Sequence, residues 1–214
     1  MSAEKQRELE QLRQQVRELE LELQKEGEVE SAWPPKDFYG MYYFTTGAFL
    51  GMIAATVSLI VNVILAPIAG KSPLELVKVY LTFPLGARAL DLSADAGGGL
   101  ILTLGCCLYL CTGLALGIPL YFLLVRFAGG KDASLIKRLV ISSVLSLAIW
   151  FIAFYGVLIW LQPMLFGGNW ITDPAVLPTW VAAGTHLIFG WTMALLYPWG
   201  QFTPYRSMAY RAAT

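Results

Sequence analysis

The chain has 214 residues, and its 15 basic and 15 acidic side chains give a formal net charge of zero at pH 7. Hydrophobic residues make up 57% of the sequence, charged residues only 14%, and the mean hydropathy is +0.59. These values exclude an ordinary soluble globular domain and indicate a membrane protein.

Residues 1–30 are predicted to form a cytoplasmic amphipathic helix. Positions 4–26 contain no Gly or Pro and are rich in residues that favour helix. Apolar residues recur at spacings of three and four and form a short heptad seam, at Leu9, Leu12, Val16, Leu19 and Leu23. A helix this short is marginal alone. We therefore expect the seam to bind another chain or a second copy of this one; a solvated helix is the alternative.

Residues 31–43 form a connector into the membrane. Trp33, Pro34 and Pro35 stiffen it, and the aromatic residues at 38–44 suit the level of the lipid headgroups. The first thirty residues contain no apolar run of the kind found in a cleavable signal peptide. The first span is therefore expected to act as its own insertion signal.

Residues 44–198 contain four apolar stretches without Asp, Glu, Lys or Arg in their cores, at about 44–68, 99–124, 139–161 and 179–198. A helix of about 20 apolar residues crosses the roughly 30 Å hydrocarbon layer of a bilayer, and it satisfies its own backbone hydrogen bonds there. The predicted fold class is therefore all-α, a polytopic membrane protein with four transmembrane helices. Residues 199–214 follow as a cytoplasmic tail.

The basic residues predict the orientation. With four spans, the two termini and the middle loop lie on one side of the membrane, and those segments contain 12 of the 15 Lys and Arg residues. The opposite side contains only Lys71, Lys78 and Arg88. Basic residues favour the cytoplasmic side. We therefore expect a multi-pass protein of the inner (cytoplasmic) membrane with both termini in the cytoplasm.

Small residues recur every four positions on several spans, which allows another helix to approach closely. These candidate helix-packing residues are Gly47, Gly51, Ala55, Gly113, Gly117, Ala182 and Gly190. They are expected to pack the four helices together or against neighbouring subunits. Asn62, an amide deep in the first span, is expected to form an interhelical hydrogen bond.

The connection between the first two spans is predicted to contain a short interfacial helix on the outer side. Ser72 would be its N-cap and Pro73 its first residue, while Leu74, Val77, Tyr80 and Leu81 would share one apolar face. The sequence Phe-Pro-Leu-Gly at 83–86 would end it. The last outer connection, 162–178, is expected to form a short ordered cap.

The sequence contains no recognisable catalytic or nucleotide-binding motif, so we expect no enzyme activity. Cys106, Cys107 and Cys111 fall within the second span and are interpreted as small packing residues. No metal site is expected. The spans also lack the acidic and basic residues that line the pathways of ion pumps and proton-coupled transporters.

His186 is the one candidate cofactor ligand. Ala182 and Gly190 lie one turn before and after it, which would leave room for a flat ring beside the helix. Neutral imidazole ligates the metal of tetrapyrroles in this way. The alternatives are a contact with a quinone or lipid, or a structural histidine bonded to a neighbouring helix. The structural interpretation is the one we predict, with no cofactor bound by the chain alone.

These features predict a non-catalytic accessory subunit of a larger membrane complex. An energy-transducing complex of respiratory or photosynthetic electron transfer is expected by analogy, because such complexes contain small helical subunits. The expected partners are other membrane subunits and the lipid bilayer, with a homo-oligomer also open and no nucleic acid. Two alternatives are a pigment- or haem-binding subunit and a small homo-oligomeric channel or transporter.

Overall fold

The structure is a computed structural model that describes residues 12–16, 18–22, 36–92, 98–129 and 133–202. The chain divides into two units, residues 1–41 with 203–214, and residues 42–202. In the first unit, residues 12–16, 18–22 and 36–41 are helical. Throughout the described ranges every regular element is a helix.

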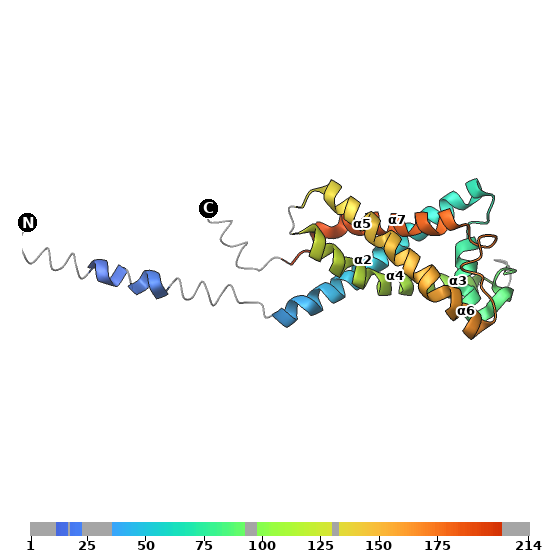
Figure 1. Cartoon of the computed structure of the whole chain (residues 1–214), viewed down its shortest axis with the longest axis horizontal. Coiled ribbons are helices and arrows are strands. Elements are labelled where there is room, and N and C mark those ends of the chain that lie inside the picture. The colour runs from blue at the N-terminus through green and yellow to red at the C-terminus, as the bar shows by residue number, and fades with distance from the viewer. Residues whose placement is uncertain (1–11, 17, 23–35, 93–97, 130–132, 203–214) are drawn as a thin grey trace, which may run out of the picture. The chain divides into compact units, whose positions relative to one another are not determined.

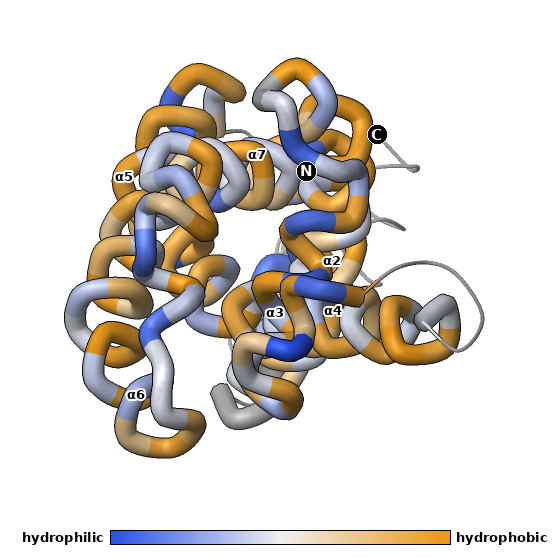
Figure 2. Tube along the Cα trace, turned by 90° about the vertical axis from the view of Figure 1, so that its right-hand side faces the viewer, coloured by the Kyte–Doolittle hydropathy of each residue, from blue (hydrophilic) through white to orange (hydrophobic). Residues whose placement is uncertain are grey.

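Four helical segments are long and apolar enough to cross a membrane, at Gly40–Ile68, Gly98–Ala128, Leu135–Phe166 and Thr179–Gly200. This confirms the four predicted spans. All four are longer than predicted, and the second and third continue beyond their uncharged cores into residues such as Arg126 and Lys137. In Figure 1 the helices α2 (Lys36–Leu65), α4 (Gly98–Ala128), α5 (Leu135–Phe151) and α7 (Thr179–Leu196) of these spans cross one another obliquely. Hydrophobic residues dominate these helices (Figure 2).

The third span is not one continuous α-helix. After α5 comes a π-helical segment, η3 (Ile152–Leu158), and then α6 (Ile159–Phe166). Within η3, Phe154 is buried and packs edge-on to His186 of α7, with ring centroids 5.9 Å apart. Local π-helical geometry is uncommon and occurs often at functional sites. Here it places an aromatic ring against the candidate histidine.

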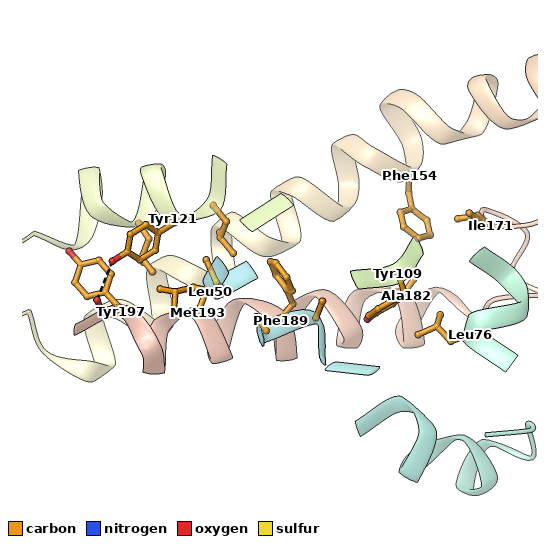
Figure 3. Close-up of a cluster of buried hydrophobic side chains, with 14 of the residues drawn as sticks. Leu50, Leu76, Tyr109, Tyr121, Phe154, Ile171, Ala182, Phe189, Met193 and Tyr197 are labelled. Carbon is orange, nitrogen blue, oxygen red and sulfur yellow. Dashed lines mark hydrogen bonds between the residues drawn. The ribbon is translucent and has the colours of Figure 1, made fainter. Parts of the chain in front are cut away.

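The main core contains buried side chains from α2, α3 (Glu75–Leu85), α4, η3 and α7. Leu120, Tyr121 and Leu124 of α4 are fully buried, as is Met193 of α7. Tyr121 donates a hydrogen bond to the carbonyl of Tyr197 in η4 (Tyr197–Gly200), as Figure 3 shows. Large apolar side chains and one satisfied phenol thus fill this half of the bundle.

The connection between the first two spans contains η1 (Ala66–Ala69), α3 (Glu75–Leu85) and η2 (Gly86–Ala89). The predicted helix is present and ends within the predicted Phe-Pro-Leu-Gly segment at 83–86, but its predicted start at Pro73 is wrong. The helix begins at Glu75, because residues 72–75 form a turn before it. In this turn the Ser72 carbonyl accepts from the Glu75 amide, and the Ser72 hydroxyl donates to the Glu75 carboxylate. It continues through Pro84 and ends at Gly86, whose φ of +61° suits glycine.

Burial on α3 is also broader than one apolar stripe. Thr82, which is not one of the four residues of the predicted apolar face, is fully buried, and its hydroxyl accepts a hydrogen bond of 2.9 Å from Gln162 of α6. Gln162 also accepts a bond from the backbone amide of Ile171. The Gln162 side chain therefore joins α3, α6 and the 167–178 connection. Within that connection, Asp173 accepts hydrogen bonds from the backbone amides of Ala175, Val176 and Leu177.

Candidate functional site

A polar cluster joins three spans in the middle of the bundle. We define it as Ser58 and Asn62 of α2, Tyr109 of α4 and Thr185 of α7. The Ser58 hydroxyl donates to the Thr185 carbonyl at 3.1 Å, and the Tyr109 hydroxyl donates to Ser58 Oγ at 3.1 Å. Ser58 is fully buried and Tyr109 is 5% exposed. Because lipid offers no hydrogen-bond partners, such bonds hold helices together.

The expected interhelical hydrogen bond of Asn62 is present. Its Nδ2 donates to the carbonyl of Ser58 at 2.8 Å, and its Oδ1 lies 3.1 Å from the Thr185 hydroxyl. That hydroxyl also lies 2.7 Å from the carbonyl of Val181. A threonine has one hydroxyl proton to give to these two acceptors. Asn62 Oδ1 can therefore accept a hydrogen bond from a further donor. Its Nδ2 also has a second hydrogen that can be donated to a further acceptor.

His186 lies beside this cluster. Its Nδ1 is 2.9 Å from the carbonyl of Ala182, one turn earlier, which assigns the ring proton to Nδ1 and makes Nε2 an acceptor. The ring lines a cavity of about 20 Å³ with Tyr80, Tyr109 and Phe189. That volume holds about one water molecule.

The space predicted beside His186 for a flat ring is occupied at one end. A Cβ built on Gly190 would lie 2.6 Å from Ser146 Oγ and 3.0 Å from the Ser142 carbonyl of α5. Gly190 therefore allows the close approach of α5 and leaves no room there for a macrocycle. Ala182, on the other side, is 3% exposed.

Tyr80 of α3 packs against the polar cluster through Tyr109. Its ring meets that of Tyr109 edge-on, with centroids 4.8 Å apart. Burial raises the pKa of Tyr80, and the neighbouring Tyr109 raises it further. The phenol therefore stays protonated at any physiological pH and acts as a neutral hydrogen-bonding group.

The predicted packing rows on the first two spans face each other. A Cβ built on Gly51 would lie 2.6 Å from the Cα of Gly117, and one on Gly117 would lie 2.5 Å from the Cα of Gly51. Gly47 lies against Gly117 in the same way, and the Ala55 methyl group fills the space beside Gly113. The backbones of α2 and α4 thus meet without side chains between them.

Cys106, Cys107 and Cys111 all lie on α4. Among the described residues, no three His, Cys, Asp or Glu side chains are grouped to hold a metal. Cys106 packs beside a buried cluster that contains Val77 and Leu81. Cys107 and Cys111 are exposed, so for these two the predicted packing role within the chain is wrong.

A pocket of about 220 Å³ lies between α2, α3 and α7. Most of its walls are aliphatic, but Asn62 and Thr185 line it from the cluster, and Lys71 and Glu75 line it from the connection after α2. Sequence reasoning missed this pocket because three separate segments form it. Only Asn62, isolated in an apolar span, pointed toward it.

The heptad seam lies in the first unit. Its described members, Leu12, Val16 and Leu19, are 54%, 53% and 58% exposed. Leu9 and Leu23 lie outside the described residues.

The chain was also compared with known proteins. No protein-family model, curated protein or solved structure matches it. Its function must therefore be inferred from the chemistry of these sites.

Proposed function

We propose that the chain is a non-catalytic accessory subunit of a larger membrane assembly, held in that assembly by its N-terminal helix. The observation that carries this proposal is the exposed seam at Leu12, Val16 and Leu19. Lipid can cover the apolar surfaces of the four spans, but it does not cover leucines of a charged, water-soluble helix. Contiguous exposed apolar surface of this kind marks a protein contact, and a helix of another subunit fits a heptad seam.

The bundle itself supports a structural role. Its polar side chains bond one another across helices, as in the Ser58–Tyr109 and Gln162–Thr82 pairs. We propose that the spans lie in the inner membrane with both termini in the cytoplasm, as the distribution of Lys and Arg favours. In this orientation α3 and the 167–178 connection lie at the outer face.

The two alternatives receive less support. A tetrapyrrole on His186 would need space that α5 fills beside Gly190. A pore lined by span-three serines would need Ser142 and Ser146 to be free, whereas both are buried against α7 and bond backbone carbonyls of their own helix.

The experiment is purification of the tagged full chain from its native membrane in mild detergent, followed by identification of the proteins bound to it. Leu12→Glu with Leu19→Glu places two charges on the seam. We expect this variant to lose its partner subunits while remaining folded in the membrane.

The matched control is Gln14→Glu with Leu21→Glu. These positions have the same seven-residue spacing and are exposed, but they lie off the seam. The control should retain every partner. If the seam variant also retains them, the accessory role is not mediated by this helix and the proposal fails; if only copies of this chain co-purify, the protein is a homo-oligomer instead.

A further inference from the structure

We propose that the pocket between α2, α3 and α7 binds one zwitterionic phospholipid with a primary ammonium headgroup. This inference requires the membrane location but not the accessory role, so the two can fail separately.

The mouth has one positive and one negative side chain. Lys71 and Glu75 both line the pocket. Within the described part of the chain, neither forms an ion pair, and the Glu75 carboxylate accepts a hydrogen bond from Ser72. A headgroup that has both a phosphate and an ammonium complements this pair, with phosphate on Lys71 and ammonium on Glu75. A primary ammonium can donate hydrogen bonds to the carboxylate, and a quaternary one cannot.

The next polar group lies deeper. Asn62 precedes the end of α2 by three residues, which places it about 5 Å further along the helix axis. Asn62 lines the pocket, and its Nδ2 has a second hydrogen besides the one donated to the Ser58 carbonyl. The ester carbonyls of a glycerophospholipid lie below the headgroup by a similar depth and accept hydrogen bonds. Asn62 is therefore placed to bind an ester.

Apart from these polar groups, most of the pocket walls are apolar. Val61 and Leu65 of α2, Leu76 and Val79 of α3, and Val181 and Ile188 of α7 line the pocket. Leu76 extends from α3 on the side of α7, as Figure 3 shows. Aliphatic walls suit an acyl chain, whose burial is favourable in proportion to the apolar area covered. Trp180, which is 68% exposed at the start of α7, also lines the pocket and suits the interfacial level.

Gly184 provides a specific test. It lines the pocket, and a Cβ built on it would have no atom within 4 Å. Gly184→Leu should therefore fill the pocket without displacing backbone. Gly156→Leu is the matched control, because Gly156 is exposed on another span and its added Cβ would meet only Ile152 Cγ2, at 3.7 Å.

The measurement is native mass spectrometry of the full chain after detergent exchange and incubation with vesicles of phosphatidylethanolamine, phosphatidylcholine or phosphatidylglycerol. We expect one retained phosphatidylethanolamine, with less of the other two. Gly184→Leu should abolish retention and Gly156→Leu should not.

Lys71→Gln and Glu75→Gln each test the mouth at partly exposed positions that leave the core intact. Each should reduce retention of phosphatidylethanolamine about tenfold, because each removes the charge that strengthens a hydrogen bond to the headgroup. Retention that survives Gly184→Leu would overturn the assignment to this pocket. Equal or stronger retention of phosphatidylglycerol, unaffected by Glu75→Gln, would overturn the zwitterionic headgroup.

Discussion

At the residue scale, the central bonds of the bundle depend on one hydroxyl group. Ser58 Oγ donates to α7 and accepts from Tyr109 of α4, so a single small side chain on α2 links three spans. A buried hydroxyl without a partner is costly, and in a bilayer no water replaces the lost partner.

We predict that Ser58→Ala lowers the free energy of unfolding by about 1–2 kcal/mol, because it leaves the Tyr109 hydroxyl without its acceptor and removes the hydrogen bond to the Thr185 carbonyl. Unfolding in mixed detergent micelles measures this change. Thr56→Val is the control, because Thr56 is exposed and bonds only the carbonyl of Met52 in its own helix. An effect of Ser58→Ala no larger than that of the control would contradict the role of the cluster.

We predict that His186 has a structural role. His186→Gln keeps a side chain able to donate to the Ala182 carbonyl, and it should change the unfolding free energy by less than about 1 kcal/mol. The visible absorption spectrum of protein purified from its native membrane should be the same for both forms. A pigment band that decreases or shifts in the variant would show a bound tetrapyrrole and contradict the prediction.

At the element scale, glycine allows the close contact of α2 and α4. We predict that Gly117→Ala destabilises the bundle by about 3 kcal/mol, at the upper end of overpacking effects, because the added methyl group would meet the Gly51 backbone rather than a side chain that can move. Gly156→Ala, on an exposed face, should have little effect. Unfolding measurements on both variants test the difference, and equal stabilities would mean that α2 and α4 separate at no cost.

The sequence predicted the four spans better than the helix boundaries, the π-helical segment and the contacts between the helices. The length and apolarity of the four spans were sufficient to identify them, since they depend on composition alone. The start of α3 was predicted two residues too early, because hydrogen bonds of Ser72 make a turn before Glu75. The burial of Thr82 was not predicted, because its partner Gln162 comes from another span. The π-helical segment η3 was not predicted, because Phe154 packs against His186 from another span and no local pattern marks that contact. The pocket was missed for the same reason.

At the scale of the whole molecule, the orientation is a prediction that the fold alone does not test. An even number of spans places both termini on one side, and the 12 basic residues on that side favour the cytoplasm. The pocket for the proposed phospholipid would then open toward the outer leaflet. Orientation therefore also decides which leaflet supplies the lipid.

We predict that Asn169→Cys, in the connection before α7, reacts with a membrane-impermeant maleimide on intact cells, whereas Ser134→Cys, before α5, reacts only after permeabilisation. Both native residues are exposed. The background should have Cys106, Cys107 and Cys111 replaced by alanine, although thiols that face lipid react poorly because the thiolate is disfavoured there. Labelling of Ser134→Cys on intact cells, with Asn169→Cys protected, would reverse the orientation and place Lys71 and Glu75 at the cytoplasmic leaflet.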